Sequence, residues 1–266
     1  MTGRRRQPGR RGELATASAL KLQVSKIVAS TTAGRLIGAL TRNRVRHHGL
    51  RFDVRSDDFS PRVRAQMFWG AYEGAETRMI RSFLRDAATV VELGSSLGVT
   101  TAHIAAMMVP GGHLICVEAN PGLIPGLRAR TLRGAASLHV DLIHAAVTSH
   151  GGMTMLTVAA ETVGSRLGRP RPHEATVPVP AVTLRDILRR TGVADYDLVS
   201  DIEGAEAAFL LQDAAVLEGC RRGVIELHDT TLDGAKVSVT DLLDAVAAAG
   251  FQIVSRHGPV VAFARS

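Results

Sequence analysis

The sequence predicts an α/β fold in which a mostly parallel sheet ends in an antiparallel hairpin. Residues 89–121 read as an apolar strand, a glycine-serine turn, a helix that runs to Met108 and a second strand, a unit that binds nucleotides in many proteins. Two more apolar strands, at 196–201 and 223–227, are each followed by a helical pattern. The last two strands lie within residues 251–264. The turn between them is too short for a crossover, so they must be antiparallel.

The other elements follow from apolar spacing and turn residues. A helix is expected over 14–40, with a break at Ser30-Thr31-Thr32 that can cap its second half. Residues 160–177 are polar and proline-rich, so we expect a surface loop, either a lid beside a ligand site or a plain insertion. Further strands are expected at 50–54, at either 137–140 or 142–147, at 153–158 and at 177–184, and further helices at 76–84, 121–132, 184–191 and 239–249.

Length and composition indicate a globular protein with a substantial core. The 266 residues can hold one α/β domain of ordinary size plus an appendage. No apolar run approaches the ~20 residues that a membrane-spanning helix needs. Cys116 and Cys220 lack the spacing of a zinc site and indicate a reducing compartment. We therefore expect a cytoplasmic protein.

The positive charge is concentrated at the amino terminus. Residues 1–51 contain twelve lysines and arginines and one acid, Glu13, a balance of +11. Because the whole chain carries +7, the remainder carries −4. A nucleic-acid-binding enzyme would more often spread its basic surface over the folded domain, so we expect no nucleic acid partner. The basic arm could instead contact an anionic membrane peripherally, or a partner, or simply pack on the rest of the protein.

The turn after the first core strand has a ligand-binding pattern. It reads acid-x-Gly-x-x-x-Gly, and the next strand ends in a second acid, Glu118, 24 residues after Gly94. Glycine allows close approach of a ligand to the backbone, and an acid at this point can accept hydrogen bonds from a ribose diol. A dinucleotide fingerprint would need glycine in place of Ser96 and Val99. The pattern instead resembles motif I of class I S-adenosylmethionine-dependent methyltransferases.

Further pieces of the chain, in the same order, resemble the FkbM family of methyltransferases. Besides the motif I turn they are residues 69–73, 117–121, 182–188 and 201–206, within a region of roughly 68–230. The chain departs from the family pattern in having Glu92 for the commoner Asp, and Val199-Ser200 for the usual Lys-Ile. The resemblance implies a Rossmann-like class I methyltransferase fold with a mostly parallel seven-stranded sheet. It also implies methyl transfer from S-adenosylmethionine to a hydroxyl of a saccharide, glycolipid or related biosynthetic metabolite.

The resemblance assigns the cofactor contacts. The motif I turn would wrap the amino-acid end of the cofactor, Glu118 would hold its ribose, and Tyr72 would lie over the methionine. Asn120 would sit near the adenine or would only cap a helix. No acid ends the third strand, so backbone groups and small side chains would hold the adenine. The expected cofactor-binding residues are Tyr72, Glu92, Gly94, Ser95, Ser96, Gly98, Glu118, Ala119, Asn120 and Ala146.

Candidate catalytic residues stand at the carboxyl ends of the fourth and fifth core strands, where sheets of this type bind ligands. A sugar hydroxyl is a poor acid, so a histidine base or a divalent metal would assist its deprotonation. The candidates are His228, Asp201 and Glu203 for catalysis, and Asp201, Glu203 and Asp229 as oxygen ligands of a candidate Mg²⁺. Alternatively, Glu203 only opens a helix, whose N-terminus favours acids, and His228 is an ordinary loop residue.

The expected domain organisation has three parts: a disordered basic tail at 1–12, a helical extension at 13–66, and a methyltransferase domain at 67–266. Two other functions stay open. An NAD(P)-dependent oxidoreductase is disfavoured by Ser96, Val99 and the carboxyl-terminal hairpin. The second is a non-catalytic protein with a cofactor fold that tethers to a membrane or a partner through its basic arm.

Overall fold

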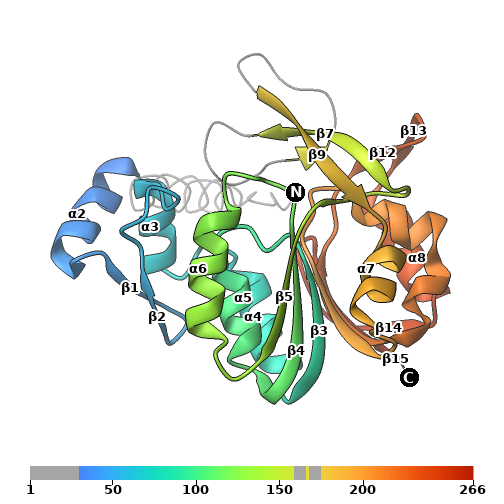
Figure 1. The fold of residues 1–266 in the computed structure, drawn as a ribbon, viewed down its shortest axis with the longest axis horizontal. Helices are drawn as coiled ribbons and strands as arrows, with labels where there is room; N and C mark the ends of the chain where they lie inside the picture. Colours follow the sequence, from blue (N-terminus) through green and yellow to red (C-terminus); the bar gives the residue numbers. More distant parts are fainter. Residues whose placement is uncertain (1–29, 159–165, 168–174, 266) are drawn as a thin grey trace, which may run out of the picture. The chain divides into compact units, whose positions relative to one another are not determined.

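The computed structural model describes residues 30–158, 166–167 and 175–265 (Figure 1). The predicted tail at 1–12 and the first part of the predicted helix at 14–40 lie outside these residues. The chain divides into two compact units, of which the first ends at Tyr72 and the second begins at Glu73. The sequence-based boundary between residues 66 and 67 falls inside a helix of the first unit.

The described part of the first unit contains two helices and a hairpin, so the predicted extension is helical only in part. Ser30 accepts a hydrogen bond from the Ala33 N–H and caps the first helix, as the Ser-Thr-Thr break predicts. The polar, basic stretch that follows pairs with itself as two antiparallel strands. The elements are α2 (Thr31–Thr41), β1 (Arg44–His47), β2 (Leu50–Asp53) and α3 (Pro61–Phe68).

A seven-stranded sheet forms the centre of the second unit, and its order confirms the predicted fold class. Only β15 runs opposite to the other strands, because it pairs antiparallel with both of its neighbours. The carboxyl-terminal hairpin is therefore confirmed. In spatial order the strands are β14 (Phe251–His257), β15 (Val260–Arg265), β11 (Cys220–Glu226), β10 (Tyr196–Ser200), β3 (Ala87–Leu93), β4 (Met108–Glu118) and β5 (His139–His144).

Helices cover both faces of this sheet, which explains the nearly continuous apolar strands (Figure 1). Val90 packs with the side chains of α4 and α5, whereas its neighbour Val91 packs on the other face with those of α7 and α8. The helices are α4 (Gly74–Phe83), α5 (Val99–Ala105), α6 (Ile124–Gly134), α7 (Leu184–Thr191) and α8 (Val239–Ala248), with a π-helical turn at Ala208–Gln212 and a 3₁₀ turn at Ala214–Gly219. No helix among the described residues is long and apolar enough to span a membrane.

One predicted boundary is wrong. The helix expected to reach Met108 ends at Ala105, and Met108 already belongs to β4, where it pairs with Ala87 of β3. The strand continues through Pro110-Gly111-Gly112. Gly111 has a φ of +78° and its N–H donates to the Ser137 carbonyl, and the register of β4 against β3 shifts across this segment.

A second, smaller sheet lies beyond the carboxyl ends of the central strands (Figure 1). It was predicted only as separate strands. One of its faces packs through Ala146, Leu156 and Val179, while Met153 and Met155 on the other face are exposed. In spatial order it consists of β6 (Ala146–Val147), β9 (Ala175–Val182), β7 (Gly152–Val158) and β8 (Arg166–Leu167). A hairpin of β12 (Thr230–Leu232) and β13 (Ala235–Val237) was not predicted.

Candidate active site

A cavity opens at the carboxyl ends of the central strands, where the strand order reverses between β3 and β10. This reversal point is where open α/β sheets bind ligands. The space between atoms in the cavity is about 710 Å³, counting the part that is open to solvent. Predicted residues that line it are Gly94, Ser96, Glu118, Ala119, Ala146, Asp201 and Glu203.

Gly94 allows the motif I turn to pass directly beside the loop that follows β10. Its φ is +88°, and a Cβ built on it would lie 2.0 Å from the Asp201 carbonyl oxygen. The backbone N–H groups of Gly94 and Ser95 both donate to the Val117 carbonyl, at 2.9 and 3.0 Å. The turn is therefore held between β4 and the β10 loop, with no room for a side chain at position 94.

Glu118 ties the end of β4 to the turn. Its carboxylate accepts hydrogen bonds from the N–H groups of Ser96, at 2.8 Å, and Asn120, at 2.6 Å. Burial raises the pKa of Glu118, and these hydrogen bonds act in the opposite direction. A carboxylate offers about four lone-pair positions, so acceptor capacity remains for a ligand in the cavity.

Other residues of the predicted set shape the turn from behind and do not line the cavity. The buried Glu92 carboxylate accepts hydrogen bonds from the hydroxyls of Ser95, at 2.8 Å, and Thr101, at 2.7 Å. Burial raises the pKa of Glu92 to about 7 against these hydrogen bonds. Asn120 accepts from the Gly122 N–H at 3.0 Å, but α6 begins only after Leu123 and has no side-chain cap, so a position of Asn120 near the adenine stays a prediction. Gly98 begins α5 with a φ of +73°.

Tyr72 ends the first unit of the chain. Its contact with the cofactor stays a prediction.

The 201–206 segment brings two acids to the cavity and uses a third to hold its own backbone. Asp201 and Glu203 line the cavity. The fully buried Glu206 accepts from the N–H groups of Ile202 and Gly204, both at 2.8 Å. Gly204 has a φ of +101°, and a Cβ there would lie 2.7 Å from the Thr230 hydroxyl. Glu206 therefore acts as a positioning residue, a role the sequence analysis did not assign.

His228 lies behind this loop, among four carboxylates, and does not line the cavity. Its Nε2 is 3.9 Å from Asp201, 3.8 Å from Glu203 and 3.8 Å from Glu226, and its Nδ1 is 3.6 Å from Glu206. Burial alone would lower the pKa of His228, but Glu206, Asp201 and Glu203 outweigh it and raise the pKa to about 9. The imidazole is then protonated at neutral pH, which opposes the predicted role as a general base.

Asp201 has an unusual environment for a carboxylate. Burial and the charges of Glu226 and Glu73 raise the pKa of Asp201, and the His228 cation opposes the shift. Within the described part of the chain, Asp201 Oδ1 is buried without a hydrogen-bond partner. Carboxylate oxygens of Glu76, Asp201 and Glu226 lie within 4.8 Å of one another, as do ligand atoms of Asp201, Glu206 and His228.

The predicted magnesium ligands are not brought together as a set. Neither of the metal-compatible groups around Asp201 includes Glu203 or Asp229. The Asp229 carboxylate instead accepts a hydrogen bond from the Val239 N–H, at 2.8 Å, near the start of α8. Of the three predicted oxygen ligands, Asp201 alone belongs to such a group among the described residues.

Residues 92–253 match the model of the FkbM methyltransferase domain family. The chain belongs to the FkbM methyltransferase family. The match spans the motif I turn, the cavity and the 201–206 segment, and it covers more than half of the chain. A comparison with curated proteins found no match.

Solved structures similar to this FkbM methyltransferase share little sequence with it. Fibrillarin from Aeropyrum pernix with natively bound S-adenosyl-L-methionine is 12% identical over 71% of this chain and 72% of that chain, with a TM-score of 0.42. The N-terminal domain of EvdMO1, in the presence of SAH and D-fucose, is 13% identical over 88% and 96%, with a TM-score of 0.40. A protein in the NADB-Rossmann superfamily from Streptococcus agalactiae is 10% identical over 71% and 67%, with a TM-score of 0.40.

The cavity of this FkbM methyltransferase fits S-adenosylmethionine. Gly94 and Ser96 present backbone beside it, and Glu118 offers a carboxylate to a ribose diol. Apolar side chains and small residues line another part of the wall, as expected for an adenine held without an acid. These are Leu123, Ala145, Ala146, Val147, Leu156 and Leu167.

Two further cavity residues were not assigned by the sequence analysis. Glu73 ends the 69–73 piece of the family resemblance, and its carboxylate accepts a hydrogen bond from the Thr100 hydroxyl. Arg166 lines the cavity from β8, inside the segment predicted to be a lid or an insertion. The rest of that segment, at 159–165 and 168–174, lies outside the described residues. Neither residue had a role assigned from the sequence, and the position of each in the fold reveals it.

Proposed function

We propose that this methyltransferase acts on a hydroxyl of a saccharide, glycolipid or related biosynthetic metabolite, and that Asp201 accepts the hydroxyl proton. The observation that supports this most is the buried Oδ1 of Asp201, a residue of the cavity wall. Among the described residues this atom has no hydrogen-bond partner, and His228 Nε2 lies 3.9 Å from it. A buried acceptor without a donor is costly, and a substrate hydroxyl would supply the missing donor. Glu203 lies in the same wall and offers a second acceptor to a polyhydroxylated substrate.

When bound, S-adenosylmethionine supplies a methyl carbon on a sulfonium, which the hydroxyl oxygen attacks in line while the carbon–sulfur bond breaks toward sulfur. The residues of the chain position the acceptor and remove its proton. The raised pKa of Asp201 makes its carboxylate a stronger base than an exposed aspartate. Glu206 holds the loop that carries Asp201, and the protonated His228 keeps a positive charge 3.9 Å from it.

The test is methyl transfer to a panel of saccharides by Asp201→Asn and Glu203→Gln, with S-adenosylhomocysteine binding measured on the same samples. We expect Asp201→Asn to lower kcat by about 100-fold or more while cofactor binding is retained, because only the proton acceptor is lost. Glu203→Gln should affect mainly KM. Full transfer by Asp201→Asn, or a product methylated on nitrogen, would contradict the proposal.

A divalent cation is the alternative means of activating the hydroxyl. Mg²⁺ prefers carboxylate oxygens, and those of Glu76, Asp201 and Glu226 lie close together. Transfer that is lost in EDTA and restored by Mg²⁺ would favour the cation. Transfer that is unchanged in EDTA would favour Asp201 acting alone.

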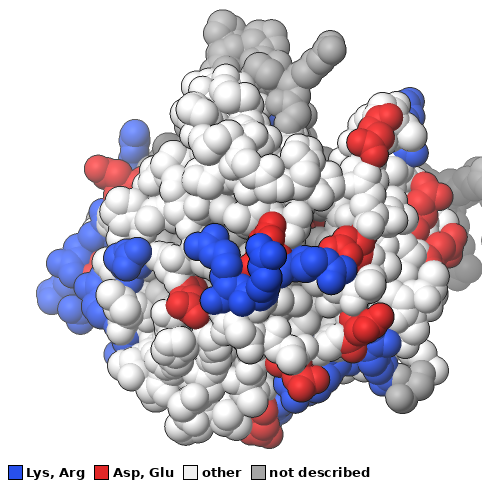
Figure 2. Space-filling model, turned by 45° about the vertical axis from the view of Figure 1, so that its right-hand side comes forward, with Lys and Arg blue, Asp and Glu red and all other residues white. Residues whose placement is uncertain are grey.

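We further propose a small-molecule acceptor in place of nucleic acid, with the basic arm at residues 1–40 as a peripheral membrane contact. Residues 1–40 carry a balance of +7, equal to that of the whole chain, so the remainder of the chain carries no net charge. On the face shown in Figure 2, acidic side chains flank the band of arginine and lysine side chains. Such mixed charge supports neither a phosphate-binding groove nor a uniformly basic face.

A further inference from the structure

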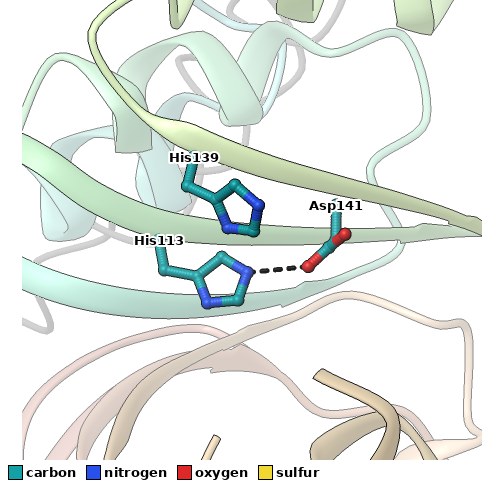
Figure 3. A group of neighbouring side chains, drawn as sticks. All are labelled: His113, His139 and Asp141. Atoms are coloured by element: carbon teal, nitrogen blue, oxygen red, sulfur yellow. Dashed lines mark hydrogen bonds and ion pairs between the residues drawn. The ribbon is translucent and has the colours of Figure 1, made fainter. Parts of the chain in front are cut away.

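Three side chains with metal-binding atoms meet on the outer two strands of the central sheet (Figure 3). His113 lies on β4 and pairs directly with His139 on the edge strand β5. Asp141 follows His139 by two residues, so its side chain emerges on the same face of the sheet. The parallel register thus brings all three side chains to one side of the β4–β5 pair.

The geometry of this cluster suits a single ion. His113 Nε2 lies 2.7 Å from Asp141 Oδ2, and the two imidazole rings are 4.4 Å apart between centroids, inclined by 52°. One ligand atom from each of the three residues falls within 4.8 Å of the others. Figure 3 shows the two rings side by side, with the carboxylate beside His113. His139 is exposed and the other two are partly exposed, so an ion can enter from solvent.

We propose that His113, His139 and Asp141 bind a divalent transition-metal ion of the Zn²⁺ type. Two imidazoles and a carboxylate are ligands that Zn²⁺ and its neighbours accept at about 2.0–2.2 Å. Small rotations of the three side chains bring their ligand atoms to those distances, and bonds to the ion replace the His113–Asp141 hydrogen bond. Three protein ligands leave a coordination position open to solvent.

This site is separate from methyl transfer. His113 precedes Glu118 by five residues on the same strand, which at about 3.3 Å per residue places it roughly 16 Å from the cofactor end of β4. An ion there cannot touch substrate or cofactor. Its effect is to clamp the edge strand β5 to β4, because its ligands come from both strands.

The test is calorimetric titration of the full, untagged chain with ZnCl₂. It compares the wild type with His139→Ala, Asp141→Asn and a matched control, His257→Ala, an exposed histidine on another strand. We expect a bound equivalent whose affinity falls at least about tenfold in His139→Ala and Asp141→Asn and is unchanged in His257→Ala. Because His139 is exposed, its replacement should leave the fold and S-adenosylhomocysteine binding intact.

The cluster around His228 also offers ligand atoms to a metal, so His228→Ala is titrated in parallel. The proposal predicts that His228→Ala keeps the zinc equivalent that His139→Ala loses. Absence of zinc binding in the wild type, or equal binding by the wild type, His139→Ala and Asp141→Asn, would overturn it. Loss of the equivalent in His228→Ala alone would assign the ion to the other cluster and would also overturn it.

Discussion

Single backbone positions decide the shape of the cofactor cavity. Gly94 and Gly204 both have positive φ, and both lie so close to a neighbouring segment that a Cβ would collide with it. Buried carboxylates then fix the two loops, Glu118 the motif I turn and Glu206 the loop after β10. The site is therefore specified as much by close contacts and by hydrogen bonds to backbone as by side chains that face the ligand.

The importance of the close contact at Gly94 can be tested by comparing Gly94→Ala with Gly111→Ala. Both glycines have positive φ, so alanine costs about 1–2 kcal/mol at either position through backbone strain alone. At Gly111 nothing lies within 4 Å of the added Cβ, whereas at Gly94 the Asp201 carbonyl lies 2.0 Å away. Urea unfolding should show the larger loss for Gly94→Ala, with loss of S-adenosylhomocysteine binding in this variant only. Equal stability and equal binding in the two variants would contradict the account of the turn.

At the scale of elements, the order of strands was easier to predict than their ends. Apolar runs followed by helical patterns predicted the four parallel strands β3, β4, β10 and β11, and the short last turn predicted the antiparallel β15. The end of α5 was mispredicted because apolar residues such as Met107 and Met108 are compatible with either a helix or a strand. In the structure Met108 pairs with β3 and therefore belongs to a strand. The second sheet was predicted only as separate strands, because β6 and β8 have two residues each and β7 pairs with β9 across a polar, proline-rich segment.

The β1–β2 hairpin gives a pH-dependent prediction. His47 at the end of β1 is buried beside His48, and its Nε2 lies 2.9 Å from the Tyr72 carbonyl. Burial, assisted by His48, lowers the pKa of His47 to about 4. As pH falls from about 6.5 toward 4, the His47 imidazole binds a proton in the unfolded chain but stays neutral in the folded chain. The first unit should then lose up to roughly 3 kcal/mol of stability, all of which is present above pH 6.5.

Urea unfolding followed by Trp69 fluorescence measures the stability of the first unit at each pH, because Trp69 is the single tryptophan and belongs to that unit. His47→Gln keeps a donor for the Tyr72 carbonyl but does not titrate. It should therefore flatten the pH dependence between pH 7 and pH 5. An unchanged pH dependence in His47→Gln would assign the effect to another group.

At the scale of the whole molecule, charge separates the amino-terminal arm from the rest of the chain. Co-sedimentation with phosphatidylcholine vesicles containing phosphatidylserine compares the full chain with a chain lacking residues 1–29. We expect binding of the full chain that weakens as salt increases, and little binding after truncation, because basic residues near an anionic surface contribute about 1 kcal/mol each. Equal binding of both chains, or of neither, would contradict a membrane role for the arm.

The fold class and the family could be read from the sequence, because motif I and the 201–206 segment are local patterns with fixed spacing. The sequence did not show which residues of these two segments face the ligand and which hold the loops in place. Glu92, Ser95 and Asn120 were expected to contact the cofactor. In the structure Ser95 donates to Glu92 and Asn120 accepts from Gly122, and their contact with the cofactor stays a prediction. Burial and the surrounding carboxylates decide whether His228 is neutral or charged, and both depend on segments that only the fold brings together.

The central claim is that the cavity at the ends of β3 and β4 binds S-adenosylmethionine through Glu118. Calorimetric titration with S-adenosylhomocysteine, and separately with NADH, tests it on the wild type, on Glu118→Ala and on a control, Glu218→Ala, at an exposed glutamate. We predict binding of S-adenosylhomocysteine alone, weakened about tenfold or more by Glu118→Ala, since each hydrogen bond to a charged group contributes about 1.5–3 kcal/mol. Binding of NADH in its place, or S-adenosylhomocysteine binding that Glu118→Ala leaves unchanged, would contradict the claim.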